Sequence, residues 1–141
     1  MLSRTSSRKW LAPAALVLAA GGSIVAPKSF ARIMRNTIDA TATIVDAGRT
    51  IVVTGPIRND RVQWNDLRVT VTQRTTGAVA EGQVRLRATT EVQQWVVEAE
   101  VQGREEFEAG PATAVALATT SRRGETDDAH QWLVAIELVG E

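Results

Sequence analysis

The residues from Gln94 to Val101 alternate between two kinds of side chain, and this alternation limits the possible folds more than any other feature. Every second position is apolar: Trp95, Val97, Ala99 and Val101. Because successive side chains of a strand point to opposite faces, the pattern predicts a strand with one buried and one wet face. A helix is the alternative reading, but the β-branched valines and the following Gly103 favour the strand.

The same alternation recurs along the chain and predicts seven short strands. We expect them at residues 38–45, 51–57, 67–72, 84–88, 94–101, 112–120 and 132–138. Turns are expected at Asp46–Arg49 and Thr75–Ala78, where Asp and Gly favour tight backbone conformations. Gly55-Pro56 is expected to break or bend the second strand. Polar loops are expected at residues 58–66 and 122–129.

No convincing helix separates these segments, so antiparallel pairing is expected. Seven short strands in about 100 residues are typical of an immunoglobulin-like β-sandwich, with a small β-barrel as the alternative. The chain contains no cysteine and no tyrosine, so neither a disulfide nor a tyrosine corner can stabilise the core. Trp64, Trp95 and Trp132 are then the large side chains that compete for the interior.

Several segments together resemble small secreted bacterial all-β proteins of unassigned function. They are Gly55-Pro56-Ile57, the runs at residues 68–73 and 76–82, Glu91-Val92-Gln93-x-Trp95 and Ala129-His130-Gln131-Trp132. The resemblance covers most of residues 50–139, although such proteins often carry cysteine pairs and this chain has none. It implies export and an all-β fold, and it implies no catalytic or binding residue.

Residues 1–31 have the features of an export signal. Arg4, Arg8 and Lys9 precede a short apolar run, which Gly21-Gly22 ends. Small residues at Ser29 and Ala31 occupy the two positions that a signal peptidase recognises. The apolar run is shorter than the approximately 20 residues that a membrane-spanning helix needs, so a cleaved signal is favoured over an anchor. We therefore expect one domain at residues 32–141 and a secreted, periplasmic or envelope location.

The net charge of the whole chain is zero, but the charges are unevenly placed. Residues 1–31 hold four basic side chains and no acid, whereas residues 32–141 hold 12 arginines and 16 acids, a net charge of −4. A domain that is acidic overall is poorly suited to nucleic acid, because that binding depends on neutralising phosphates. We therefore expect no nucleic-acid partner.

Three arginines, Arg68, Arg85 and Arg87, form the candidate binding site. A four-residue turn at Thr75–Ala78 would place Arg68 opposite Arg85, and like charges in opposed positions destabilise a sheet. One interpretation is a ladder of charges in which Glu98 and Glu100 interleave with the arginines. The other is a face that binds an anionic cell-surface polymer or lipid head groups.

Catalytic and metal chemistry has weaker support. His130 is the single histidine, and Asp127, Asp128 and His130 provide too few ligands of the preferred type for zinc. Ser121 near His130 lacks the Gly-x-Ser-x-Gly motif of a hydrolase. We therefore expect no metal, no cofactor and a non-catalytic binding or surface-contact protein. The alternative is a small secreted enzyme or enzyme inhibitor that uses His130 or the glutamates of the Glu105–Glu108 loop.

Overall fold

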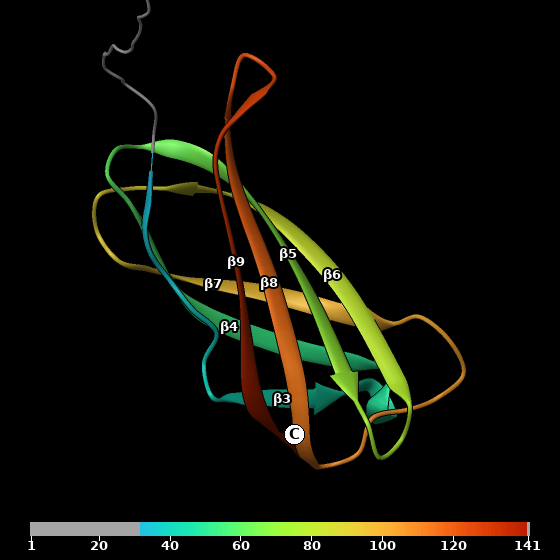
Figure 1. The fold of residues 1–141 in the computed structure, drawn as a ribbon. Coiled ribbons are helices and arrows are strands. Elements are labelled where there is room, and N and C mark those ends of the chain that lie inside the picture. The colour runs from blue at the N-terminus through green and yellow to red at the C-terminus, as the bar shows by residue number, and fades with distance from the viewer. Residues whose placement is uncertain (1–31, 141) are drawn as a thin grey trace, which may run out of the picture. The chain divides into compact units, whose positions relative to one another are not determined.

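A computed structural model describes residues 32–140, and these residues form strands that curve around one core (Figure 1). The described residues contain no helix long and apolar enough to cross a membrane. The strands are β2 (Ile33–Asn36), β3 (Thr41–Val45), β4 (Thr50–Asn59), β5 (Gln63–Gln73), β6 (Ala78–Ala88), β7 (Gln93–Val101), β8 (Gly110–Arg122) and β9 (Glu125–Gly140), with a 3-10 turn, η2 (Asp46–Gly48), between β3 and β4.

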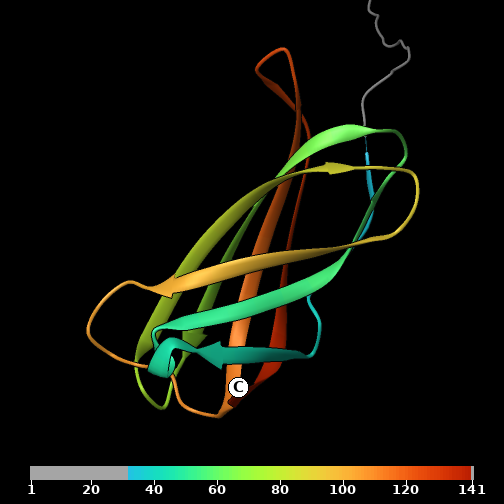
Figure 2. The ribbon, with the colours of Figure 1, turned by 180° about the vertical axis from the view of Figure 1, so that it is seen from behind.

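Seven of these strands close into a barrel. The order around it is β4, β3, β9, β8, β5, β6, β7 and back to β4, and β2 is an extra strand along the edge of β4. Strand β3 runs parallel to β9, with Thr41 beside Glu137 and Ile44 beside Gly140. The other neighbours are antiparallel. The fold is therefore a closed, mixed β-barrel (Figures 1 and 2).

The expectation of an all-β fold is confirmed, but the immunoglobulin-like sandwich is wrong, as is the purely antiparallel pairing. A sandwich keeps two separate sheets, whereas here β6–β7 and β3–β9 join the two halves of the molecule. In Figure 2, β3, β4 and β7 lie in front of β5, β6, β8 and β9 and cross them. Sandwich and barrel strands both alternate between inward and outward positions, so the sequence pattern fits both folds.

The core is built from the inward positions of every strand. Trp95 is its largest side chain and is only 1% exposed. Strand β8 contributes alanines at Ala112, Ala114, Ala116 and Ala118, all of them buried. Small barrels often combine small and large interior side chains to fill the available width. These small side chains and the Trp95 indole belong to the same buried core.

Gly55 lies directly opposite Trp95 on β4 and does not break the strand, contrary to expectation. A Cβ atom at this position would be 2.1 Å from the Thr37 carbonyl oxygen and 2.6 Å from Cζ2 of Trp95. Only glycine leaves space there for the indole. Trp95 Nε1 donates to Asn36 Oδ1 at 3.0 Å, which connects the core to β2.

Several elements differ from the expected ones. Most of the loop expected at residues 58–66 belongs to β4 and β5. Strand β2 was not predicted, and the expected loop at residues 122–129 is in fact the end of the long β8–β9 hairpin. Its tip is Arg123-Gly124, whose φ angles are 53° and 83°. Two consecutive positive φ values are the signature of a tight hairpin turn. The hairpin extends beyond the neighbouring strands (Figure 1).

Polar side chains occupy both ends of the barrel interior. Asn59 and Asn65 are buried and exchange two amide hydrogen bonds of 2.8 and 3.0 Å. At the other end, Gln73 Nε2 donates to the carbonyls of Glu108 and Pro111, and its Oε1 accepts from the Thr76 hydroxyl and the Glu108 N–H. Buried amides are tolerated when their hydrogen bonds are made, so these residues seal the ends without orphaned groups of their own.

Candidate functional site

The three candidate arginines lie on the outer face of β5 and β6. The actual register places Arg68 opposite Gln83 and Arg85 opposite Asp66. Arg87 is opposite Trp64. The expected Arg68–Arg85 pairing is therefore wrong by two residues, because Gln73 pairs with Ala78 and the turn is Arg74–Gly77. Arg68 and Arg85 are diagonal neighbours, so the arginines still share one face.

A shallow hollow of about 440 Å³ brings two of these arginines together. It is centred on β5, with β6 on one side and β8 on the other. Its lining residues are Asp66, Leu67, Arg68, Gln83, Val84, Arg85, Leu117 and Thr119. Arg68 and Arg85 thus lie in the hollow, whereas Arg87 does not line it.

Trp64 adjoins this hollow and was not recognised as part of the site. It belongs to β5, not to the expected loop, and points outward with 46% of its surface exposed. The guanidinium carbon of Arg85 is 5.5 Å from the centroid of the indole ring. This distance is within the range of cation–π attraction, which orients the Arg85 side chain. We call Trp64, Asp66, Arg68, Arg85 and Arg87 the arginine face.

The arginines of this face form no ion pair within 4 Å. Among residues 32–140, ion pairs join Arg61 to Asp60 and Arg122 to Asp127, and the His130 imidazole lies 3.5 Å from Asp128. Strand β6 pairs with β7 only at Ala80 and Glu81, where Glu81 faces Glu100. The expected ladder of Arg68, Arg85 and Arg87 with Glu98 and Glu100 is therefore wrong. Asp66 faces Arg85 across the strand pair, but it forms no ion pair with it within 4 Å.

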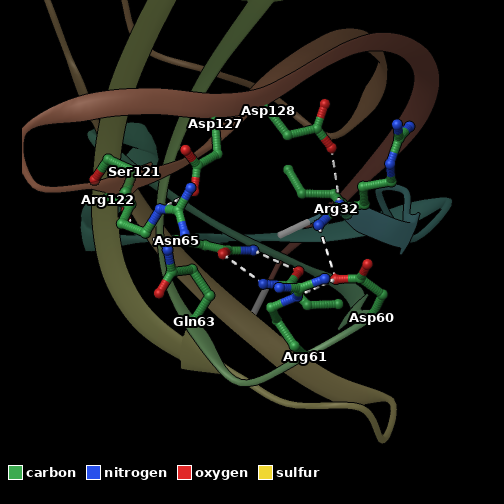
Figure 3. A network of polar contacts seen from close by, with 11 residues as sticks. Arg32, Asp60, Arg61, Gln63, Asn65, Ser121, Arg122, Asp127 and Asp128 are labelled. Carbon is green, nitrogen blue, oxygen red and sulfur yellow. Dashed lines mark hydrogen bonds and ion pairs between the residues drawn. The ribbon is translucent and has the colours of Figure 1, made fainter. Parts of the chain in front are cut away.

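A second cluster of polar side chains lies where β2, the β4–β5 connection and the β8–β9 hairpin meet (Figure 3). Asp60 Oδ1 accepts from the Arg32 N–H at 2.8 Å. Asp128 Oδ2 accepts from the Ile33 N–H at 2.9 Å. Gln63 Nε2 donates to the Ser121 carbonyl at 2.7 Å. These contacts bind the start of β2 and the hairpin to the rest of the barrel.

The structure separates the residues proposed for catalysis in this region. His130 lies opposite Ala118, whereas Ser121 lies opposite Thr126. His130 is half exposed, and its Nε2 is 3.5 Å from Asp128 Oδ2. Asp127 instead pairs with Arg122, with 3.8 Å between its Oδ2 and Arg122 Nε. A Ser121–His130–Asp127 arrangement is therefore not formed.

The other candidate ligands do not converge either. Within residues 32–140, no three His, Cys, Asp or Glu side chains are placed to hold a metal ion. The loop with Glu105, Glu106 and Glu108 is fixed by Phe107, which is buried and whose N–H donates to the Gly48 carbonyl. The three glutamates point to solvent, outside the hollow beside Trp64. The enzyme or inhibitor alternative gains no geometric support from either region.

No protein-family model matches this chain, and no curated protein matches it. The resemblance to small secreted bacterial proteins therefore stays a prediction. The candidate site is defined by its geometry alone.

Proposed function

We propose that this protein is an exported, non-catalytic binding protein that holds an anionic cell-surface polymer on the arginine face. The single observation that carries the proposal is the Arg85 guanidinium, which is stacked over Trp64 beside a hollow and has no carboxylate at ion-pair distance. A guanidinium held in this way presents several N–H donors in a fixed fork. That geometry suits carboxylate and phosphate groups.

The remaining groups of the hollow fit a polymer better than an isolated ion. Arg68 supplies a second cation diagonally across the strand pair. Asp66, Gln83 and Thr119 offer acceptors and donors for hydroxyl groups. Trp64 offers an apolar ring surface next to them. Local charge is decisive here, because residues 32–141 carry a net charge of −4 and attract no polyanion as a whole.

The test measures the retention of the purified protein on three probes. These are a carboxylated polysaccharide, poly(glycerol phosphate) and vesicles of phosphatidylglycerol. We expect Arg85→Ala to weaken binding to one of the two polymers about tenfold, since a hydrogen bond to a charged group contributes about 1.5–3 kcal/mol. Added salt should weaken the wild type more than the variant, because the lost contact is electrostatic.

Arg104→Ala is the matched control, because Arg104 is exposed, lies in the β7–β8 connection and belongs to no ion pair. It should bind as the wild type does. Equal losses in both variants, or no retention on any probe, would reject the proposed function. Retention on the vesicles alone would assign the face to lipid head groups instead.

A further inference from the structure

Two carboxylates accept hydrogen bonds from backbone N–H groups at the start of β2. The Arg32 N–H donates to Asp60 Oδ1 at 2.8 Å, and the Asp60 N–H donates back to the Arg32 carbonyl at 2.9 Å. One residue later, the Ile33 N–H donates to Asp128 Oδ2 at 2.9 Å. Figure 3 shows the two carboxylates approaching the start of β2 from different elements. Asp60 comes from the β4–β5 connection and Asp128 from β9.

Side-chain carboxylates, not the carbonyls of a neighbouring strand, accept from these two N–H groups. Backbone N–H groups in a sheet are ordinarily paired with carbonyls of the next strand. A carboxylate is a stronger acceptor than a carbonyl, because a hydrogen bond with an ionised partner is about twice as strong as one between neutral groups. An ammonium group at Arg32 N would keep this hydrogen bond and add the attraction between opposite charges.

The sequence provides a way to form that ammonium group. Ser29 and Ala31 are small residues at the third and first positions before Arg32, as a signal peptidase requires. Hydrolysis of the Ala31–Arg32 peptide bond consumes one water molecule. It leaves a carboxylate on Ala31 and an α-ammonium group on Arg32.

The geometry points to processing after Ala31 and to capture of the new α-ammonium group of Arg32 by Asp60, with Asp128 holding the next amide. The hydrogen bond from the neutral amide to Asp60 becomes an ion pair, which holds β2 on the barrel once the export segment is removed. Strand β2 supplies Asn36, the acceptor for the Trp95 indole, so the captured terminus supports the core.

The charged groups around this site set its pH dependence. Arg61 Nε is 3.5 Å from Asp60 Oδ1, and His130 Nε2 is 3.5 Å from Asp128 Oδ2. The guanidinium of Arg32 itself and the Arg122–Asp127 pair complete the surroundings (Figure 3). Asp60 is therefore shared between Arg61 and the new terminus, which limits the gain to that of a partly exposed ion pair.

An α-amino group ordinarily titrates with a pKa of about 7.7–8.0. The neighbouring carboxylates favour its charged form, so its pKa in the folded protein lies above the unfolded value. The stabilisation is therefore complete below the unfolded pKa and is lost as the pH rises through the folded pKa.

The lysine content of the chain allows this amine to be modified selectively. The two lysines of the sequence are Lys9 and Lys28, so a protein processed after Ala31 has no lysine. An amine-reactive acetylating ester then modifies the α-amino group of Arg32 alone. The full chain is expressed in an exporting bacterial host, and the intact mass of the exported product gives its first residue.

We expect the mass of a chain that begins at Arg32. Native protein should be acetylated about tenfold more slowly than unfolded protein at neutral pH, because the ion pair favours the charged, unreactive form of the amine. Asp60→Asn should remove most of this protection, whereas Glu106→Gln, a distant exposed carboxylate, should not. Acetylated protein should also unfold at a lower temperature than unmodified protein at about pH 6.5, and this gap should close at about pH 10.

Two outcomes would overturn the inference. One is an exported product that begins at another residue. The other is a product that begins at Arg32 but whose amine reacts equally fast in the folded and unfolded states. If Asp60→Asn does not fold, the folded wild type compared with its own acetylated form still decides the question. Neither result depends on whether the arginine face binds a polymer.

Discussion

At the scale of single residues, Trp95 depends on what faces it. The indole fits into the core because Gly55, directly opposite, has no side chain. Val97 and Val69 are buried with it, whereas Leu86 and Val134 are only partly buried at the margin of the same core. All five side chains therefore belong to one core or pack against it.

Replacement of Trp95 by alanine should therefore be severe. We expect Trp95→Ala to lower the free energy of unfolding by about 3–5 kcal/mol, because it removes a buried aromatic ring and leaves a cavity. Trp64→Ala is the matched control, since Trp64 lies on the outer face and should cost less than about 1 kcal/mol. Urea denaturation followed by circular dichroism measures both, and similar costs for the two variants would contradict the assigned core.

At the scale of elements, the register between two strands decides which side chains face a charged residue. The alternation along β5 and β6 correctly places Arg68, Arg85 and Arg87 outward. The turn between the strands sets which residues face each other, and a difference of two positions replaces Arg68 by Asp66 opposite Arg85. The position of β7 matters equally, because it meets β6 at only two residues. Next to these residues, Gly82 allows the backbone of β7 to approach β6 closely. A Cβ atom at Gly82 would be 2.4 Å from the Glu98 carbonyl oxygen.

A charge ladder predicts that loss of the Glu100 charge lowers stability. Because Glu100 faces Glu81, we expect the opposite. We expect Glu100→Gln to leave the free energy of unfolding unchanged or to raise it by about 0.2–0.5 kcal/mol, because it removes a like-charge contact. Added salt should reduce this difference by screening the repulsion. Thermal unfolding at low and high salt, with Glu91→Gln as an exposed control, makes the comparison. A clear loss of stability in Glu100→Gln would support the charge ladder instead.

At the scale of the whole molecule, the short parallel pairing of β3 with β9 closes the barrel. Residues 41–44 meet residues 137–140, almost at the opposite end of the described chain. The Glu137 N–H donates to the Ala40 carbonyl at 2.8 Å, and the N–H of Val139, two residues later, points to the same side. In a fold that depends on contacts between such distant segments, the chain loses conformational entropy before it gains the stabilising contacts of closure.

Proline at Val139 tests this closure, because it removes a backbone donor on the β3 side while the side chain itself points outward. We expect Val139→Pro to destabilise the protein by about 3 kcal/mol or more, and Val139→Ala by less than about 1 kcal/mol. Hydrogen exchange should show the loss of protection first in β3 and at the end of β9. Equal stability of the two variants would mean that the β3–β9 pairing does not stabilise the barrel.

The candidate site shows the same division between local and distant information. Arg68 and Arg85 were identified from the outward positions of two adjacent strands, which the period of two reveals. Trp64 was missed because its segment is rich in polar residues and was expected to be a loop. Leu117 and Thr119 were missed because they reach the hollow from β8, whose pairing with β5 depends on residues about 50 positions away.

The sequence by itself determined that the described chain is all-β, which side chains point inward in most strands, and where the turn at Asp46–Arg49 lies. These properties follow from local periodicity and from the conformational preferences of Asp and Gly. Tertiary structure alone decided that the strands close into a barrel, that β3 runs parallel to β9, and that Arg85 lies over Trp64. The physical reason is that an alternating strand only requires some partner on each edge. The partner is chosen by the packing of the whole core around Trp95.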